Sequence, residues 1–255
     1  MTTSPQLTAP NIMDIEHRND ADDKGLSDHR SRTAALRRAK MRGRLMEAAI
    51  ELYQPPSRLG TPQSVVMIDD LIVHAGVSRG SFYKYFTSVD DLVTQLGEQL
   101  VSEAMGDYER LFAGQKDAIF RAIGGSTMAL ARGWHQPPWA GFTCRINYVE
   151  FFEKRSGFGA LVRGGLRDAR AQGDIDFTSL DAAVDLTVGA TIEGRRRMMM
   201  NVDKPKSYAG ALIYHIYSGL GLSRTRCEET QSAVWQQMEN PLLRPHWWSD
   251  RAGWA

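Results

Sequence analysis

The chain has 255 residues, 42% of them hydrophobic, and its 31 Lys and Arg residues against 30 Asp and Glu residues leave a formal net charge of +1. This composition is typical of a globular protein with one large domain or two modest ones, and it excludes a uniformly basic surface for polyanions. Cys144 and Cys227 are the only cysteines, too few for a disulfide framework and too far apart for a paired-cysteine metal site.

The sequence also bears on the compartment. Its start has no signal-peptide pattern, and no apolar run approaches the roughly 20 residues that a membrane-spanning helix needs. Two cysteines suit a reducing environment. We expect a cytoplasmic protein without a membrane partner.

The first 44 residues consist of an acidic segment followed by a basic one. Residues 1–28 carry six acidic and two basic residues among many polar ones, which predicts a disordered tail. Residues 29–44 carry seven Lys and Arg residues and no acidic residue. This basic block either contacts an anionic partner or is a solvated helix start.

A first helix is predicted over residues 33–53, where apolar residues repeat at helical spacing. Pro55 and Pro56 end it, because proline cannot continue a helix. Residues 57–66 then form a loop.

Residues 67–92, MIDDLIVHAGVSRGSFYKYFTSVDDL, predict two short helices joined by a tight turn. Apolar residues in the first, Ile68–Ala75, recur at i, i+3, i+4 and i+7, which is one face of a helix. Gly76 follows, where a left-handed cap favours glycine, and Ser78 can cap the second helix.

The predicted second helix, residues 79–86, has two different faces. Phe82 and Phe86 are four residues apart and are expected to point inward, whereas the other side chains are mostly basic, hydroxyl-bearing or aromatic. Such an outer face suits docking against an anion, and helix-turn-helix units place this helix in the DNA major groove. Ser88 and Asp91 predict the start of the next helix.

These residues resemble the DNA-binding domain of the TetR family of one-component transcriptional regulators. The matching segments are RLMEAAIELY (44–53), IDDLIVHAGVSRGSFYKYF (68–86) and SVDDLV (88–93). Two features depart from the family pattern. The loop over 57–66 is longer than usual, and Met67 stands where the family often has a Ser or Thr that caps the helix and touches phosphate.

The resemblance implies an all-α fold, in which an N-terminal three-helix, helix-turn-helix DNA-binding domain precedes a larger helical ligand-binding and dimerisation domain. We therefore expect four parts: a disordered tail (1–28), the DNA-binding domain with its basic extension (29–95), the ligand-binding and dimerisation domain (96–223) and a Trp-rich tail (224–255).

The resemblance also implies which residues contact DNA. Base edges would be faced by Arg79, Gly80, Ser81 and Lys84, with Arg79 bidentate to guanine as the sharpest single prediction. Phosphates would be bound by Tyr83, Tyr85, Thr87 and Ser88. The basic block, including Arg42 and Arg44, would follow the backbone or enter the minor groove. The alternative for the second helix is an ordinary solvated face.

The remainder of the chain predicts helices separated by glycine- and proline-containing breaks. They are expected over residues 89–113, 116–135, 139–153, 159–172, 179–201 and 207–222. Arg195, Arg196 and Arg197 are interpreted as a solvated helix end, and the alternative is an anion site. The tail carries four tryptophans, Trp235, Trp247, Trp248 and Trp254, and part of it is expected to pack on the body.

The resemblance implies that the last two helices form a four-helix bundle with a partner subunit, so that the protein is a homodimer with a near-palindromic operator. Each helix has a stripe of small and apolar residues; the alternative is that both stripes are core of one chain. The stripes are Leu180, Ala183, Val184, Thr187, Ala190 and Thr191, and Leu212, Ile216, Gly219 and Leu220.

The middle helices would surround a pocket for a small apolar or aromatic molecule, as the family implies. For each candidate side chain the alternative is an ordinary core aromatic. The candidates are Met105, Tyr108, Phe112, Trp134, His135, Trp139, Phe142, Asn147, Tyr148, Phe151 and Phe152.

Together these patterns predict a ligand-responsive transcriptional repressor that a small-molecule effector releases from double-stranded operator DNA. We expect no enzymatic activity, cofactor or metal site, because no catalytic constellation, phosphate-binding loop or metal-ligand spacing is present. The alternative is a DNA-binding adaptor without a small-molecule ligand, controlled by a protein partner through the Trp-rich tail.

Overall fold

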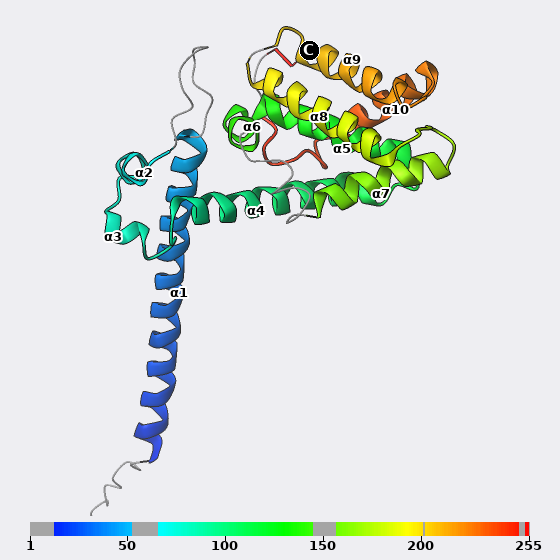
Figure 1. Ribbon diagram of the computed structural model, residues 1–255. Helices are drawn as coiled ribbons and strands as arrows, with labels where there is room; N and C mark the ends of the chain where they lie inside the picture. Colours follow the sequence, from blue (N-terminus) through cyan, green and yellow to red (C-terminus); the bar gives the residue numbers. More distant parts are fainter. Residues whose placement is uncertain (1–12, 53–65, 145–156, 201, 250–252, 255) are drawn as a thin grey trace, which may run out of the picture. The chain divides into compact units, whose positions relative to one another are not determined.

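The computed structural model describes residues 13–52, 66–144, 157–200, 202–249 and 253–254, with side chains from residue 32 onward. All regular structure in these residues is helical (Figure 1), which confirms the predicted all-α fold. None of the described helices is both long enough and apolar enough to cross a bilayer.

The helices follow one another with short connections. They are α1 (Met13–Leu52), α2 (Ile68–Ala75), α3 (Arg79–Phe82), α4 (Val89–Tyr108), the π-helical turn η1 (Glu109–Ala113), α5 (Ala118–His135), α6 (Pro137–Thr143), α7 (Phe158–Ala171), α8 (Leu180–Met199), α9 (Pro205–Ser218) and α10 (Arg224–Glu239).

Helix α1 is longer than the sequence predicts. A disordered tail is predicted over 1–28 and a helix from residue 33, but α1 already begins at Met13. No proline lies between Pro10 and Pro55, and extending an existing helix costs less than starting one. By its internal contacts the chain divides within α1, into Met1–Leu45 and Met46–Ala255. The four predicted parts remain a prediction.

The helix-turn-helix forms as predicted in its turn and is shorter than predicted in its second helix. Gly76 adopts φ 61° and ψ 44°, and its N–H and that of Val77 bond to the carbonyls of Val73 and Ile72, which closes α2. Ser78 Oγ accepts the Ser81 N–H at 3.1 Å. After Phe82 the chain tightens into turns, in which Tyr85 N–H bonds to the Phe82 carbonyl three residues back.

The larger part of the chain is organised around α5. This helix is buried along almost its whole length and contacts α4, α6, α7, α8, α9 and α10 (Figure 1). Its apolar residues join those of η1, α7, α8, α9 and α10 in one core. The predicted helix over 139–153 is α6, which ends at Thr143; residues 145–156 lie outside the described residues.

The Trp-rich tail packs on the body, as predicted, and its first half is a helix. Residues 224–239 form α10, which contributes Val234 and Met238 to the core. Beyond it, Trp247 is 3% exposed and its Nε1 donates to Asp107 at 2.7 Å. Trp248 and Trp254 stack around His135, with ring centroids 4.3 and 4.8 Å from the imidazole.

Candidate functional site

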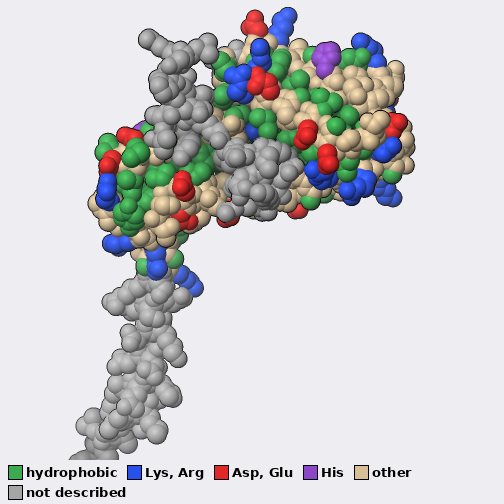
Figure 2. Space-filling view, in the orientation of Figure 1, with side chains coloured by type: hydrophobic (Ala, Val, Ile, Leu, Met, Phe, Trp, Pro, Cys, Tyr) green, Lys and Arg blue, Asp and Glu red, His purple; other side chains and the backbone are tan. Residues whose placement is uncertain are grey.

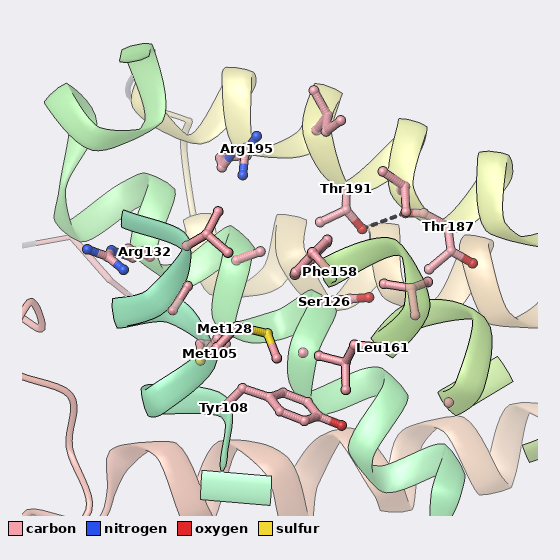
Figure 3. A pocket seen from close by; sticks show the side chains of 18 of the residues that line it. Met105, Tyr108, Ser126, Met128, Arg132, Phe158, Leu161, Thr187, Thr191 and Arg195 are labelled. Carbon is pink, nitrogen blue, oxygen red and sulfur yellow. Dashed lines mark hydrogen bonds between the residues drawn. The ribbon is translucent and has the colours of Figure 1, made fainter. Parts of the chain in front are cut away.

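A mostly apolar cavity of about 110 Å³ lies between α4, α5, α6, α7 and α8 (Figure 3). Its size is comparable to that of an engineered cavity of roughly 150 Å³ known to bind benzene. The lining residues are Gly97, Leu100, Val101, Ala104, Met105, Tyr108, Arg121, Ala122, Gly125, Ser126, Met128, Ala129, Arg132, Trp139, Thr143, Phe158, Leu161, Val162, Gly165, Leu166, Thr187, Val188, Thr191, Ile192, Arg195 and Tyr217.

Three of the predicted ligand-binding residues line this cavity, namely Met105, Tyr108 and Trp139. Four others, Phe112, Trp134, His135 and Phe142, are buried but lie outside the lining. Asn147, Tyr148, Phe151 and Phe152 lie outside the described residues.

The four buried residues outside the lining occupy other places in the core. The ring of Phe112 packs on Gly124, where a Cβ would lie only 2.7 Å from it, and next to Phe120. His135 turns toward the tail, and its Nδ1 lies 3.1 Å from Ser249 Oγ. Aromatic spacing on a helix therefore identified buried positions without showing which of them face the cavity.

Several hydroxyl groups around the cavity form hydrogen bonds within the protein. Thr187 and Thr191 Oγ1 donate to the carbonyls four residues back at 2.8 and 2.7 Å. Ser126 Oγ and the Tyr217 hydroxyl lie 3.1 Å apart, and burial raises the pKa of Tyr217. This hydroxyl therefore stays protonated at neutral pH and cannot act as a base.

Three arginines line the cavity, none of them predicted from the sequence to bind ligand: Arg121, which pairs with Asp168 at 3.0 Å, and the more deeply buried Arg132 and Arg195. Arg132 on α5 is 3% exposed and Arg195 on α8 is 7% exposed. The prediction that Arg195 belongs to a solvated helix end is wrong: Arg196 and Arg197 are exposed, whereas Arg195 lies on the face of α8 toward α5 and α6. The helical period separates these neighbours, because successive residues point about 100° apart.

Helix α4 connects the cavity with the end of the helix-turn-helix. Ser88 Oγ accepts the Asp91 N–H at 3.0 Å and so caps α4. Asp91 in turn accepts the N–H and hydroxyl of Thr87 at 2.7 and 3.0 Å, and these bonds lower its pKa. Further along the same helix, residues from Gly97 to Met105 line the cavity. Thr87 and Ser88, both predicted to bind phosphate, therefore also fix this helix start.

The residues predicted to face DNA lie on the outside of the helix-turn-helix. Gly80 and Lys84 are exposed, Tyr83 is 54% exposed, and Ser81 and Tyr85 are partly buried. Phe82 and Phe86 point inward as predicted, at 0% and 1% exposure. The outer face is therefore available to a partner.

Arg79 forms an ion pair with Asp69 of α2, with Nη2 2.5 Å from Oδ1, and this hydrogen bond raises the pKa of the arginine. Of the two upstream arginines, Arg42 is partly buried and Arg44 is exposed on α1. Met67 cannot cap α2 as Ser or Thr would; instead the Asp70 carboxylate accepts the Met67 N–H at 3.3 Å.

No family model and no curated protein matches the chain. Several solved structures are similar to it. The crystal structure of RolR in complex with resorcinol is similar at a TM-score of 0.54 and 20% identity, over 78% of this chain and 96% of that one. The crystal structure of a gamma-butyrolactone receptor, an ArpA-like protein, is similar at a TM-score of 0.57 and 16% identity, over 79% and 98%. At these identities the likeness establishes the fold, and that fold agrees with the resemblance to TetR-family regulators.

Proposed function

We propose that the protein is a TetR-type transcriptional regulator that binds operator DNA and responds to a small molecule in the cavity. The single observation that carries this proposal is α4, which begins at the end of the helix-turn-helix and lines the cavity along its C-terminal half. A ligand that favours one placement of α4 would shift the population of DNA-binding conformations. The resulting regulator is a repressor that its effector releases.

The effector has a small, mostly apolar body of about one ring, because the cavity is mostly apolar and its volume is close to that of cavities that accept benzene. The likeness to resorcinol-bound RolR supports the same size class. Release of fluorescent operator DNA by a panel of single-ring compounds, resorcinol included, tests this proposal.

A matched pair of variants sharpens this experiment. Ala104→Phe fills the cavity from α4 and should abolish release while DNA binding persists. Ala160→Phe places the same ring on an exposed position of α7 outside the lining and should respond normally. Equal release of operator DNA by effector in the two variants would argue against effector binding in this cavity.

The DNA-reading face consists of Arg79, Gly80, Ser81 and Lys84 toward bases, and Tyr83, Tyr85, Thr87 and Ser88 toward phosphates. Its exposure and the inward packing of Phe82 and Phe86 support this assignment. Arg42 and Arg44 extend it along the backbone.

We further propose that the protein is a homodimer formed through α8 and α9. The predicted stripes themselves face inward in part, because Ala183, Val184 and Ile216 are buried in the core. Leu186 is instead 42% exposed on α8, and a Cβ on Gly219 would lie 3.6 Å from it. In the view of Figure 2, hydrophobic side chains lie between charged ones over the bundle containing these helices.

The adaptor alternative draws less support. Its partner would dock on the Trp-rich tail, but Trp235 and Trp247 are buried, and Trp248 and Trp254 pack around His135. The described residues hold no group of three or more His, Cys, Asp and Glu residues that could bind a metal ion.

A further inference from the structure

Two cationic side chains lie toward one end of the cavity, away from Thr187 (Figure 3). The guanidinium carbons of Arg132 and Arg195 lie 4.6 and 5.0 Å from the centre of the Trp139 ring. Both arginines are more than nine-tenths buried. Arginine stays protonated even when burial lowers its pKa, as it does at Arg132.

Among the described residues, the two arginines at this end have one carboxylate as an ion-pair partner between them. Arg132 Nη2 pairs with Glu103 Oε2 at 3.2 Å, whereas the nearby Asp107 pairs with Arg110 at 2.5 Å. Within the described part of the chain, no carboxylate forms an ion pair with Arg195, whose Nη2 reaches only the Thr143 carbonyl at 3.5 Å. An uncompensated buried charge is costly, so the site favours an anion.

Three buried donors at the same place also lack an acceptor. Arg132 Nη1, Arg195 Nε and Trp139 Nε1 have no hydrogen-bond partner among the described residues. Leaving such donors unsatisfied is unfavourable, and a carboxylate offers two oxygens that can accept from several donors at once. Elsewhere the lining is mostly apolar and includes Met105, Met128 and Leu161.

From this arrangement we propose that the cavity binds a carboxylate with an apolar body, its carboxylate between Arg132 and Arg195 beside Trp139 and its body against Met105, Met128 and Leu161. The proposal rests on the proposed function and names the chemical class of its effector. Charge-assisted hydrogen bonds to the two guanidinium groups supply the selectivity for the acid over a neutral molecule of the same shape.

The test compares matched acids and alcohols on the purified full chain by calorimetry, at constant ionic strength. The pairs are benzoate with benzyl alcohol, phenylacetate with phenylethanol, and hexanoate with hexanol. At least one acid should bind about tenfold or more tightly than its alcohol, a difference of roughly 1.4 kcal/mol. Tighter binding of the alcohols, or no binding of any acid at millimolar concentration, overturns the proposal.

Arg195→Met provides the decisive variant, because removing Arg132 would also leave Glu103 without its ion-pair partner. The acid preference should disappear in Arg195→Met and persist in Arg197→Met, an exposed position on the same helix. Without ligand, Arg195→Met should melt no lower than the parent, since it removes an uncompensated charge. An unchanged acid preference in Arg195→Met overturns the proposal.

These outcomes remain distinguishable from failure of the proposed function. Alcohols that bind best and release operator DNA would leave a ligand-responsive regulator without an anion site. Sequence-specific DNA binding is measured separately and does not depend on the charge of the effector.

Discussion

Arg79 is an exposed side chain whose direction is fixed by an ion pair within the protein. Asp69, one helix earlier, holds its guanidinium at 2.5 Å, and both side chains are more than half exposed. Two of the three guanidinium nitrogens remain outside this contact, and an arginine fork can bind guanine through two donors. If Arg79 reads a base as proposed, the ion pair orients its guanidinium group in advance.

Replacing Arg79 by Ala should remove base discrimination at one position of each half-site, worth about 1–3 kcal/mol. Thermal stability should barely change, because an ion pair this exposed to solvent contributes little to folding. Anisotropy titrations with the operator and its single-base variants measure the effect. Arg224→Ala, which removes another exposed ion-paired arginine, is the control. If Arg79→Ala keeps the parent's base preference, the assigned role of Arg79 fails.

Tyr217 carries the clearest pH dependence in the described residues. Burial raises its pKa in the folded protein above the value of about 10 expected for an unfolded chain. The folded state therefore holds this proton where the unfolded state has lost it, so the contribution is fully present below about pH 10 and is lost as pH rises further.

Raising the pH from neutral to above about 10 should therefore lower the free energy of unfolding of Tyr217→Phe less than that of the parent. At neutral pH the variant should be about 1 kcal/mol less stable, because Ser126 loses its 3.1 Å partner. Denaturant unfolding at the two pH values tests both statements. A parallel decline of the two proteins with pH would contradict the assignment.

Single residues were the hardest level to predict from sequence. Phe82 and Phe86 were placed correctly because helical spacing alone separates them from their neighbours. Arg132 and Arg195 were missed because arginine is ordinarily exposed, and only the packing of α5 against α8 buries them.

Among the elements, the helix-turn-helix contains two glycines whose backbone conformations differ, Gly76 and Gly80. Gly76 has a positive φ of 61°, which other residues adopt only with strain. Gly80 has no positive φ, and a Cβ there would meet no atom within 4 Å. The fold therefore requires glycine at the turn but not in α3, where we propose that it leaves room for DNA.

Gly76→Ala should lower the free energy of unfolding by about 1 kcal/mol. Gly80→Ala should leave the free energy of unfolding unchanged or raise it slightly, since alanine favours helix. It should weaken DNA binding, because its methyl group would face the DNA major groove in the proposed complex. Chemical denaturation and operator titration on both variants separate the two effects. Unimpaired DNA binding by Gly80→Ala would show that the backbone does not approach DNA closely there.

The basic block that precedes the helix-turn-helix can be tested by deletion. Removing residues 1–36 takes away Arg30 and Arg32 together with the acidic segment. If the block contacts phosphates, the deletion should lower operator affinity and flatten its dependence on salt, because fewer counterions are released. An unchanged slope would show that Arg30 and Arg32 do not contact phosphates.

The elements themselves were predicted well where apolar spacing and caps agree, as for α2, α5 and α8. Their limits were predicted less well. Helix α1 begins earlier because nothing in its sequence stops it, and α3 ends at Phe82 because the next turn tightens to bring Phe86 inward. Tertiary packing decided the second case, and sequence periodicity carries no information about it.

For the whole molecule, the proposed dimer makes a direct prediction. Leu186→Glu places a charge on the exposed seam of α8 and α9 and should yield monomers in light scattering, with much weaker operator binding. Leu242→Glu changes a residue that is 91% exposed beyond α10 and should remain dimeric. A dimeric Leu186→Glu protein would place the interface elsewhere.

The global fold followed from the sequence because helix-forming segments and a recognisable helix-turn-helix together left few alternatives. The cavity did not, because it arises where α4, α5, α6, α7 and α8 meet, and residues far apart in the chain line it. Which aromatics face it depends on helix rotation within the bundle. The predicted dimer stripes show the same limit, since several of their residues belong to the chain's own core.

The most direct measurement is selection of bound sequences from a random DNA pool by the purified full chain at a stated salt concentration. A dimeric reader should enrich a near-palindrome whose half-sites are about one helical turn apart. Salt-sensitive binding without any enriched sequence would contradict sequence reading by α3.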